Sequence, residues 1–341
     1  MSVEEAGRRP KAVLLYSGGL DSTIALYSLF SMGVDVVALH FDILSSGFGS
    51  DSRVGLSVTE NAGRLGVKVV KAGVDEEYLE ILKHPKHGYG RSVNPCVDCR
   101  IYMLKCAKKI MDVEGADFIA TGEVVGQRPF SQKVKMLMAI DREAGVEGLV
   151  VRPLSGRLLP ETIPEVRGLV KREAMFDIQG RGRSAQMKLA RQLGIVVYPT
   201  PAGGCMLTES AFGRRFRDLK KHNRDFGLKD LLLLRFGRHF RLDDGSKIVV
   251  CRNEAENNAV LKLASDEDIL FEAVGFKGPL GIYFGGLSTG SIGTAASYIA
   301  SYSKAPEDML VKVRFWNKSG SFEKVVEVYA LPRDLLHKNL I

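Results

Sequence analysis

The sequence predicts an α/β fold in which a doubly wound parallel sheet is followed by a smaller α+β domain. Apolar strands alternate with helical segments up to about residue 155, and their βαβ spacing implies parallel pairing with right-handed crossovers. Beyond about residue 225 the pattern changes to short strands with two helices. In a parallel sheet of this kind, ligands bind beyond the carboxyl ends of the strands.

The individual elements follow from local patterns, because strands are short apolar runs whereas helices carry apolar residues at helical spacing and often end at glycine. In the first part we expect strands at 11–16, 35–43, 67–74 and 116–121 and helices at 21–33, 53–66 and 99–115. In the last part we expect strands at 239–242, 247–252, 269–274, 281–286, 310–316 and 322–331 and helices at 253–264 and 289–302. The predicted divisions are a tail of residues 1–10, a sheet domain of residues 11–165, a basic helical extension of residues 166–224 and an α+β domain of residues 225–341.

Length and composition limit the classes of protein to consider. A chain of 341 residues is long enough for two or three domains, and a net charge of +8 favours a polyanionic partner such as nucleic acid. Apolar runs are too short to span a bilayer, and residues 1–10 lack the apolar core of a signal peptide. We therefore expect a cytoplasmic protein without a membrane partner. Five cysteines, an odd number, favour metal, redox or catalytic use over a disulfide framework.

The turn between the first strand and the first helix, YSGGLDS at residues 16–22, has the features of a phosphate site. Gly18 and Gly19 permit positive φ angles and leave the backbone open to a ligand. The helix N-terminus that follows attracts anions through its unpaired N–H groups and its dipole. Because no lysine follows the glycines, this is not a Walker A loop. A tight turn without a chemical role is the alternative interpretation.

Three cysteines have a spacing or neighbours that suggest chemistry. Cys96 and Cys99, in NPCVDC, lie just before a predicted helix, where amide dipoles lower thiol pKa values and two thiolates can share a metal. Cys205, in the basic extension, follows Gly203 and Gly204 and is the best candidate for a third ligand. Three thiols either bind an iron–sulfur cluster with one iron left open or form a catalytic pair plus a nucleophile. The remaining cysteines, Cys106 and Cys251, lie in apolar contexts that favour packing roles.

SGGLDS at residues 17–22 resembles the PP-loop, S-G-G-x-D-S, of the ATP pyrophosphatase superfamily at all five specified positions. The resemblance implies an adenine nucleotide α hydrolase-like fold and an enzyme that splits ATP between its α and β phosphates. The loop residues expected to bind the nucleotide are Ser17, Gly18, Gly19, Asp21 and Ser22.

Two further segments resemble tRNA-modifying enzymes. NPCVDC is similar to the N-P-C-x-x-C of tRNA 2-thiouridine synthetases, and TGEVVGQ at residues 121–127 is similar to the T-G-E-x-x-G-Q of tRNA 4-thiouridine synthases. Both families thiolate uridine in tRNA, and the resemblance covers about residues 11–210. It implies that Gly122 and Gln127 help to hold the nucleotide. His40 and Phe41, at the end of the second strand, would lie beside adenine, although a structural core histidine is an equally good interpretation of His40.

The resemblance also implies a metal cofactor. In PP-loop relatives with three cysteines, all three bind a 4Fe-4S cluster whose open iron is proposed to carry the added sulfide. Cys96, Cys99 and Cys205 map onto that pattern. The sequence shows neither the N-terminal THUMP module usual in 4-thiouridine synthases nor a rhodanese-like domain. We therefore expect free sulfide or an external sulfur donor.

Residues 231–264 are similar to the RNA-binding module of NFACT proteins, which supplies an expected site for tRNA. Basic clusters support the same partner, because phosphate contacts use such residues. These clusters contain Arg181, Arg183, Arg214, Arg215, Arg217, Lys220, Lys221 and His222, together with the basic residues of GRHFR at 237–241.

Together these features predict an ATP-dependent tRNA sulfurtransferase. The uridine carbonyl oxygen attacks the α-phosphate, pyrophosphate leaves into the loop amides, and Asp21 with Mg²⁺ offsets the developing charge. Sulfur then displaces AMP, with Cys99 and Cys205 as the catalytic cysteines. Two other classes stay open: a PP-loop amide ligase or aminating enzyme, and a non-catalytic RNA-binding protein regulated by nucleotide. A homodimer is one assembly to consider.

Overall fold

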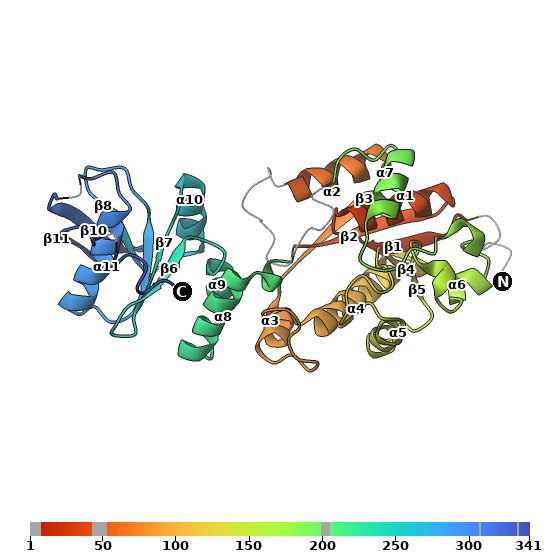
Figure 1. Cartoon of the computed structure of the whole chain (residues 1–341), viewed down its shortest axis with the longest axis horizontal. Coiled ribbons are helices and arrows are strands. Elements are labelled where there is room, and N and C mark those ends of the chain that lie inside the picture. Colours follow the sequence, from red (N-terminus) through yellow and green to blue (C-terminus); the bar gives the residue numbers. More distant parts are fainter. Residues whose placement is uncertain (1–7, 43–52, 199–204, 307, 333) are drawn as a thin grey trace. The chain divides into compact units, whose positions relative to one another are not determined.

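The computed structural model describes residues 8–42, 53–198, 205–306, 308–332 and 334–341. The chain forms two compact units, Met1–Thr208 and Glu209–Ile341, called here the first unit and the C-terminal unit (Figure 1). The basic extension expected at residues 166–224 is therefore divided between them. Within the described residues, the helices are too short or too polar to cross a bilayer.

The first unit contains a five-stranded sheet in the order β3-β2-β1-β4-β5, and every neighbouring pair is parallel. The central strand β1 is almost fully buried, as expected for a strand covered on both faces. The chain order reverses between β1 and β4, so the carboxyl ends of these two strands form the switch point at which α/β sheets bind ligands. The strands are β1 (Lys11–Leu15), β2 (Asp35–Asp42), β3 (Lys68–Gly73), β4 (Phe118–Thr121) and β5 (Val150–Val151).

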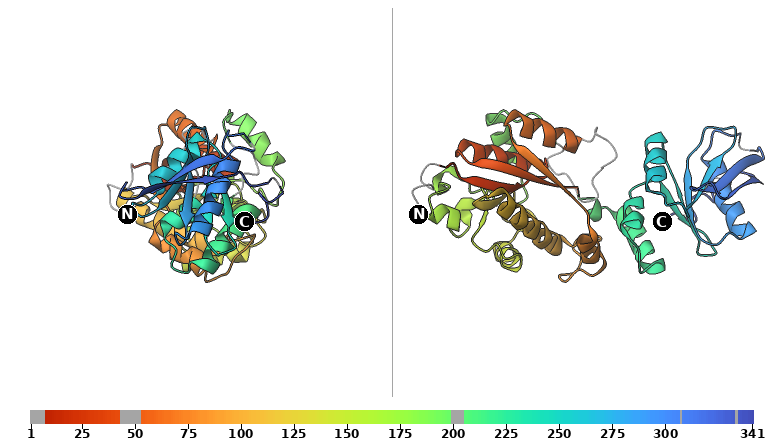
Figure 2. Two further views of the ribbon diagram at one scale, coloured as in Figure 1. Left: turned by 90° about the vertical axis from the view of Figure 1, so that its left-hand side faces the viewer. Right: turned by 180° about the vertical axis from the view of Figure 1, so that it is seen from behind.

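Helices cover both faces of this sheet, which confirms the predicted doubly wound fold. One face carries α1, α2 and α7, and the other carries α3, α4 and α5, as the front and back views agree (Figures 1 and 2). The helices of the first unit are α1 (Leu20–Ser31), α2 (Arg53–Arg64), α3 (Glu76–Lys83), α4 (Cys96–Glu114), α5 (Val134–Glu143), α6 (Ile163–Val166) and α7 (Ser184–Gln192).

The C-terminal unit contains a six-stranded antiparallel sheet in the order β11-β10-β8-β9-β7-β6. Alternate residues of its strands enter two apolar clusters: Ile248 packs on the α11 side, and Val249 packs on the side of α9 and α10. The strands are β6 (Arg238–Arg241), β7 (Lys247–Val250), β8 (Ile269–Ala273), β9 (Gly281–Phe284), β10 (Val311–Asn317) and β11 (Glu323–Val328). The helices are α8 (Ser210–His222), α9 (Leu228–Leu233), α10 (Glu254–Leu263) and α11 (Thr289–Ser301).

Three helices are missing from the sequence prediction: α3, α5 and α9. All three have ten residues or fewer, and short amphipathic segments are hard to distinguish from loops by periodicity alone. For α3 a local signal exists, because the Asp75 carboxylate accepts a hydrogen bond from the Tyr78 backbone N–H and caps the helix.

Candidate active site

The turn after β1 is held by its own serines. Gly18 has a φ of 71°, and Gly19 is the N-cap residue of α1. The Ser17 hydroxyl accepts a hydrogen bond from the Gly19 N–H at 3.3 Å, and the Ser22 hydroxyl donates to the Gly19 carbonyl at 3.0 Å. Because Gly19 has no side chain with which to cap the helix, the N–H groups of the first turn of α1 are suited to an anionic ligand.

The end of β4 lies against this turn and requires a glycine. Leu15 of β1 pairs with Thr121 of β4, so the residue after Thr121 reaches the start of α1. A Cβ atom on Gly122 would lie 2.5 Å from the Ser22 backbone nitrogen and 2.7 Å from the Asp21 carbonyl carbon. The structure therefore gives Gly122 a packing contact with the PP-loop helix, in addition to the nucleotide-binding role expected from the sequence.

Asp21 occupies a polar, mostly buried position at the start of α1. Its Oδ2 accepts a hydrogen bond from Gln127 Nε2 at 3.0 Å and lies 3.8 Å from Arg183 Nη2. Its Oδ1 is buried and no hydrogen bond of normal geometry reaches it, although the Gln186 side chain lies close enough to lower the pKa of Asp21. Burial raises the pKa of Asp21, and Arg183 and Gln127 oppose that rise. An unpaired carboxylate oxygen beside an anion-binding turn fits a Mg²⁺ ion, which proteins commonly hold through one or two carboxylates and the phosphates of the ligand.

His40 and Phe41 lie at the carboxyl end of β2, in different environments. His40 Nδ1 lies 2.9 Å from the Tyr16 carbonyl oxygen, directly before the PP-loop. Phe41 is buried, and its ring meets the Tyr102 ring edge-on at 6.1 Å between centroids. The structure therefore puts His40 next to the loop and Phe41 in the core between β2 and α4.

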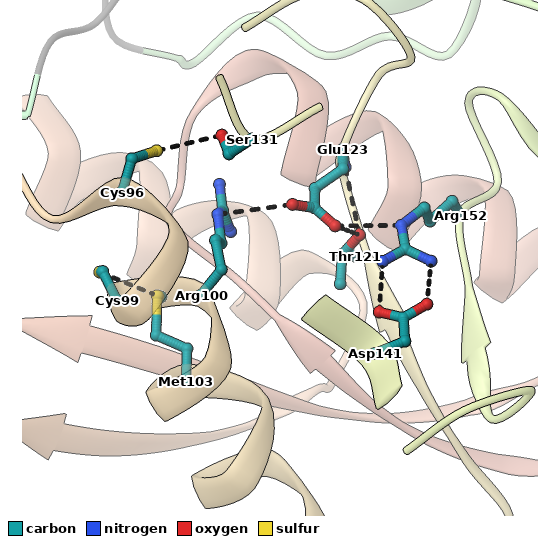
Figure 3. Close-up of polar contacts among 9 residues, drawn as sticks. All are labelled: Cys96, Cys99, Arg100, Met103, Thr121, Glu123, Ser131, Asp141 and Arg152. Carbon is teal, nitrogen blue, oxygen red and sulfur yellow. Dashed lines mark hydrogen bonds and ion pairs between the residues drawn. The ribbon is translucent and has the colours of Figure 1, made fainter. Parts of the chain in front are cut away.

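The first turn of α4 carries Cys96 and Cys99, and their thiols make different contacts (Figure 3). Cys96 Sγ donates to Ser131 Oγ at 3.0 Å. Cys99 Sγ accepts a hydrogen bond from the Tyr78 hydroxyl at 3.5 Å and lies 3.8 Å from Met103 Sδ.

Cys205 approaches the other two cysteines through the loop before α4. The Val93 backbone N–H donates to the Leu207 carbonyl at 3.2 Å, which ties the segment of Cys205 to that loop. Cys96 and Cys205 both perturb the pKa of Cys99 electrostatically, after the larger effect of burial. The three thiols therefore share one region of the first unit. Gly203 and Gly204 lie outside the described residues.

The expectation that the start of α4 lowers the thiol pKa values is wrong for Cys99. Burial raises its pKa to about 12, although the Tyr78 hydrogen bond and Arg100 act in the opposite direction. Burial likewise raises the pKa of Cys205. At Cys99, loss of hydration penalises a thiolate more than the helix N-terminus stabilises it. A bound metal ion would reverse this balance, because coordinating thiols are deprotonated.

Three neighbouring thiols have the donor chemistry of an iron–sulfur or zinc site. Among the residues that the structure describes, however, no three His, Cys, Asp or Glu side chains are arranged to hold a metal ion. The thiols of Cys96 and Cys99 turn toward separate partners (Figure 3). The three thiols therefore have the right chemistry to bind a cluster, but their side chains do not point toward a common centre in this structure.

Beside the cysteines lies a buried ion-pair network that the sequence analysis does not predict (Figure 3). Arg152 donates from Nε to Glu123 Oε2 at 3.0 Å and forms two hydrogen bonds with Asp141, at 2.8 and 2.7 Å. The side chains of Arg152, Glu123 and Asp141 are each at most 5% exposed. Arg100, the residue after Cys99, lies 3.4 Å from Glu123 Oε1. Burial raises the pKa of Glu123, but Arg100 and Arg152 outweigh it and hold the pKa below its usual value.

One stretch of chain, residues 122–131, connects the PP-loop to the cysteines, and we call it the bridging segment. Gly122 contacts the first turn of α1, Gln127 donates to Asp21, and Ser131 accepts from Cys96. Burial raises the pKa of both Asp21 and Cys205, and Arg128 opposes the rise at each. The PP-loop and the thiols are therefore connected through this segment, from the end of β1 to the start of α4.

The basic clusters expected to contact RNA phosphates have varied surroundings. Arg183 lies near Asp21 in the first unit. In the C-terminal unit, Arg215 donates to the Leu234 carbonyl at 2.9 Å, and Arg241 pairs with Asp218 at 2.6 Å. Part of the basic charge thus stabilises the units themselves.

Two family models match this chain. Residues 7–163 match the thiamine biosynthesis protein (ThiI) family, and residues 237–340 match the NFACT protein RNA binding domain. These matches confirm the two resemblances inferred from the sequence.

Curated relatives carry names from tRNA thiolation. The tRNA-specific 2-thiouridylase MnmA of Hahella chejuensis is 25% identical over 224 residues, which cover 63% of this chain and 57% of the relative. The probable tRNA sulfurtransferase of Methanothermobacter thermautotrophicus is 29% identical over 180 residues, with coverages of 51% and 42%. That of Methanobrevibacter smithii is 32% identical over 159 residues, with coverages of 44% and 38%. The matched part of the chain spans 38–57% of the length of these relatives.

Solved structures with partial similarity include the U34-tRNA thiolase NcsA from Methanococcus maripaludis with its 4Fe-4S cluster. It has a TM-score of 0.34 and 14% identity, covering 69% of this chain and 73% of that chain. A 4-thiouridine synthetase in complex with RNA and ATP has a TM-score of 0.34 and 24% identity, covering 54% and 50%.

We expect Gly122→Ala to separate β4 from the PP-loop, because the new methyl group would overlap backbone atoms that have no alternative rotamer. Overpacking of this kind costs roughly 1–3 kcal/mol. The midpoint temperature of thermal unfolding and the affinity for ATP should both fall. The control is Gly63→Ala, where a Cβ atom meets nothing within 4 Å. An ATP affinity equal to that of the control would contradict the proposed contact.

We expect Glu123→Gln to destabilise the first unit by about 3–5 kcal/mol, because it removes the counter-charge that the buried Arg152 shares with the partly exposed Arg100. Urea unfolding measures the loss. The matched control is Glu147→Gln, which removes the partner of Arg142 from an exposed ion pair and should cost about 1 kcal/mol or less. Equal losses in the two variants would mean that the network is not a buried electrostatic unit.

Proposed function

We propose that this protein is an ATP-dependent tRNA sulfurtransferase, which replaces a carbonyl oxygen of uridine in tRNA by sulfur. The observation that carries the proposal is the bridging segment, which contacts both the PP-loop and a cysteine of α4. Thiolation needs two chemistries to meet, the activation of an oxygen by ATP and the delivery of sulfur. The two family matches and the names of the curated relatives support the same activity.

In the first step the uridine carbonyl oxygen attacks the α-phosphorus of ATP, the bond to the β-phosphate oxygen breaks, and pyrophosphate leaves. The backbone N–H groups of the loop from Ser17 to Ser22 would donate hydrogen bonds to the leaving pyrophosphate and stabilise its negative charge. Asp21 would hold Mg²⁺ through its unpaired Oδ1, while Gln127 fixes the other carboxylate oxygen. In the second step sulfur bonds to the activated carbon and AMP leaves.

Cys96, Cys99 and Cys205 would hold a 4Fe-4S cluster, with Cys99 and Cys205 nearest to the sulfur chemistry. When bound by three thiolates, such a cluster has one iron without a protein ligand, which can hold sulfide. Arg100 would contribute a fixed positive charge next to these thiolates, because its guanidinium group already interacts with Cys96 and Cys99. Sulfide or an external donor would supply the sulfur.

The C-terminal unit would hold the tRNA, in keeping with its match to an RNA binding domain. A cytoplasmic location and a homodimer are further parts of the proposal. A PP-loop ligase or aminating enzyme is less favoured, because it would leave three neighbouring thiols without a role. A nucleotide-regulated RNA-binding protein would bind ATP without releasing pyrophosphate.

Asp21→Ala should abolish most AMP formation in the presence of tRNA. The variant loses the carboxylate that offsets charge at the α-phosphate, a loss of about 3 kcal/mol or more in the transition state. Release of AMP and pyrophosphate is the measurement. Asp112→Ala on the exposed side of α4 is the control and should keep its rate. An unchanged rate in the Asp21 variant would instead favour the regulatory RNA-binding protein.

Protein purified without oxygen and reconstituted with iron and sulfide should bind one cluster per chain. Serine at position 96, 99 or 205 should reduce the iron and sulfide content, because each substitution removes a thiolate ligand. Cys106→Ser is the matched control, since Cys106 lies farther along the same helix. Full iron in the three variants and loss in the control would refute the assignment. A colourless protein with a Cys99–Cys205 disulfide would indicate a persulfide mechanism.

A further inference from the structure

The C-terminal unit contains a pocket of about 280 Å³ that no part of the proposed mechanism uses. Its walls come from α8, α9 and one face of the sheet formed by β6, β7 and β9. The residues of α8 and α9 that line it precede residue 237, where the match to the RNA binding domain begins. The pocket is therefore lined both by the matched domain and by the α8–α9 segment that lies outside the match.

The strand register brings the polar residues of the pocket together. His239 pairs with Val249 and Arg241 pairs with Lys247, while Lys247 also pairs with Phe284 on its other side. Directly paired residues lie on the same face of a sheet, and residues two positions apart along a strand do so as well. Lys247 and His239 are thus diagonal neighbours, with Cα atoms about 7–8 Å apart.

Lys247 is a buried cation with incomplete pairing. Its side chain is 7% exposed, and Nζ lies 3.4 Å from Asp218 Oδ2. The same carboxylate already serves Arg241, at 3.1 and 2.6 Å, so two cations share one counter-charge. Burial lowers the pKa of Lys247 to about 8, although Asp218 opposes the shift. An ammonium group has three protons to donate, so an anionic oxygen in the pocket would complete its bonding.

His239 offers a hydrogen-bond acceptor, whereas Lys247 offers donors. It is fully buried, and its Nε2 lies 2.8 Å from the Phe236 carbonyl, which can only accept, so Nε2 carries the proton. Burial keeps the ring neutral by lowering its pKa well below the usual value. Nδ1 is therefore an acceptor, and no hydrogen bond of normal geometry reaches it, although the Leu233 carbonyl also interacts with the ring. A ligand hydroxyl would satisfy it.

We propose that this pocket binds a ribose phosphate of single-stranded RNA, with a phosphate oxygen on Lys247 and the 2′-hydroxyl on His239. The 2′-hydroxyl is the group that distinguishes RNA from DNA. Leu219, Val249 and Phe284 supply an apolar wall for the sugar and the edge of a base. A phosphopeptide would offer the anion, but its phosphoserine has no neighbouring hydroxyl for His239. The inference rests on the RNA-binding part of the proposed function and assigns it a position.

The test uses the full-length protein with a short oligoribonucleotide and the oligodeoxynucleotide of the same sequence, with uracil in both. Lys247→Met should weaken RNA binding and reduce the slope of log affinity against log salt by about 1. Lys247→Arg should retain binding, because it keeps the charge. Lys262→Met is the matched control, since Lys262 is exposed on α10 in the same unit. His239→Phe should reduce RNA affinity to the level of DNA and leave DNA affinity unchanged.

Equal RNA affinity for the Lys247→Met and Lys262→Met proteins would overturn the proposal, as would equal binding of RNA and DNA by the unmodified protein. A third result would also overturn it. If inorganic phosphate or a phosphopeptide displaced the bound RNA as effectively as unlabelled oligoribonucleotide does at the same concentration, the pocket would bind an anion only. If a variant fails to fold, the RNA preference of the unmodified protein and these competitions decide.

Parallel measurement of AMP formation separates this inference from the proposed function. Ribose preference without AMP formation would refute the sulfurtransferase and leave the pocket assignment intact. AMP formation without ribose preference would refute the pocket alone.

Discussion

The close approach of Gly122 to the first turn of α1 is the constraint on which the rest of the first unit depends. A parallel sheet brings the carboxyl ends of β1 and β4 side by side, but side chains would normally hold the two following loops apart. With only hydrogen on the α-carbon, the backbone after β4 contacts Asp21 and Ser22 directly. The same short contact delivers Gln127 to Asp21 and the rest of the bridging segment to the cysteines. The PP-loop and the cysteine-bearing start of α4 are thus brought into one region by a missing side chain.

The thiols illustrate a competition between two local effects. A position in the first turn of a helix favours a thiolate, whereas burial favours the neutral thiol. Cys99 lies in the first turn of α4 but is covered by Tyr78 and Met103, so burial dominates. A free nucleophilic thiolate is correspondingly unfavourable at Cys99, and a bound metal ion would have to displace the thiol proton.

Sequence reasoning succeeded for features that depend on contiguous residues and failed for those that depend on charges far apart in the chain. Adjacent glycines after a buried run predict the PP-loop, and apolar strands alternating with helices predict the parallel sheet. Glu123, Asp141 and Arg152 are separated along the chain, and charged residues are normally exposed, so a buried network among them has no local signature. Likewise, the packing role of Gly122 follows from the pairing of β1 with β4. The apolar pattern of a strand does not determine the register of that pairing.

The buried network has a consequence for how sequences of this kind can diverge. Arg100 and Arg152 are balanced by Glu123 and Asp141, so the cluster as a whole is neutral. Any single replacement that removes a charge leaves an unbalanced ion in the interior, whereas a joint replacement by well-packed apolar side chains does not. Viable evolutionary paths therefore change the members of the network in concert. Covariation among these four positions, rather than at each of them separately, is the mark that this electrostatic balance should leave on the family.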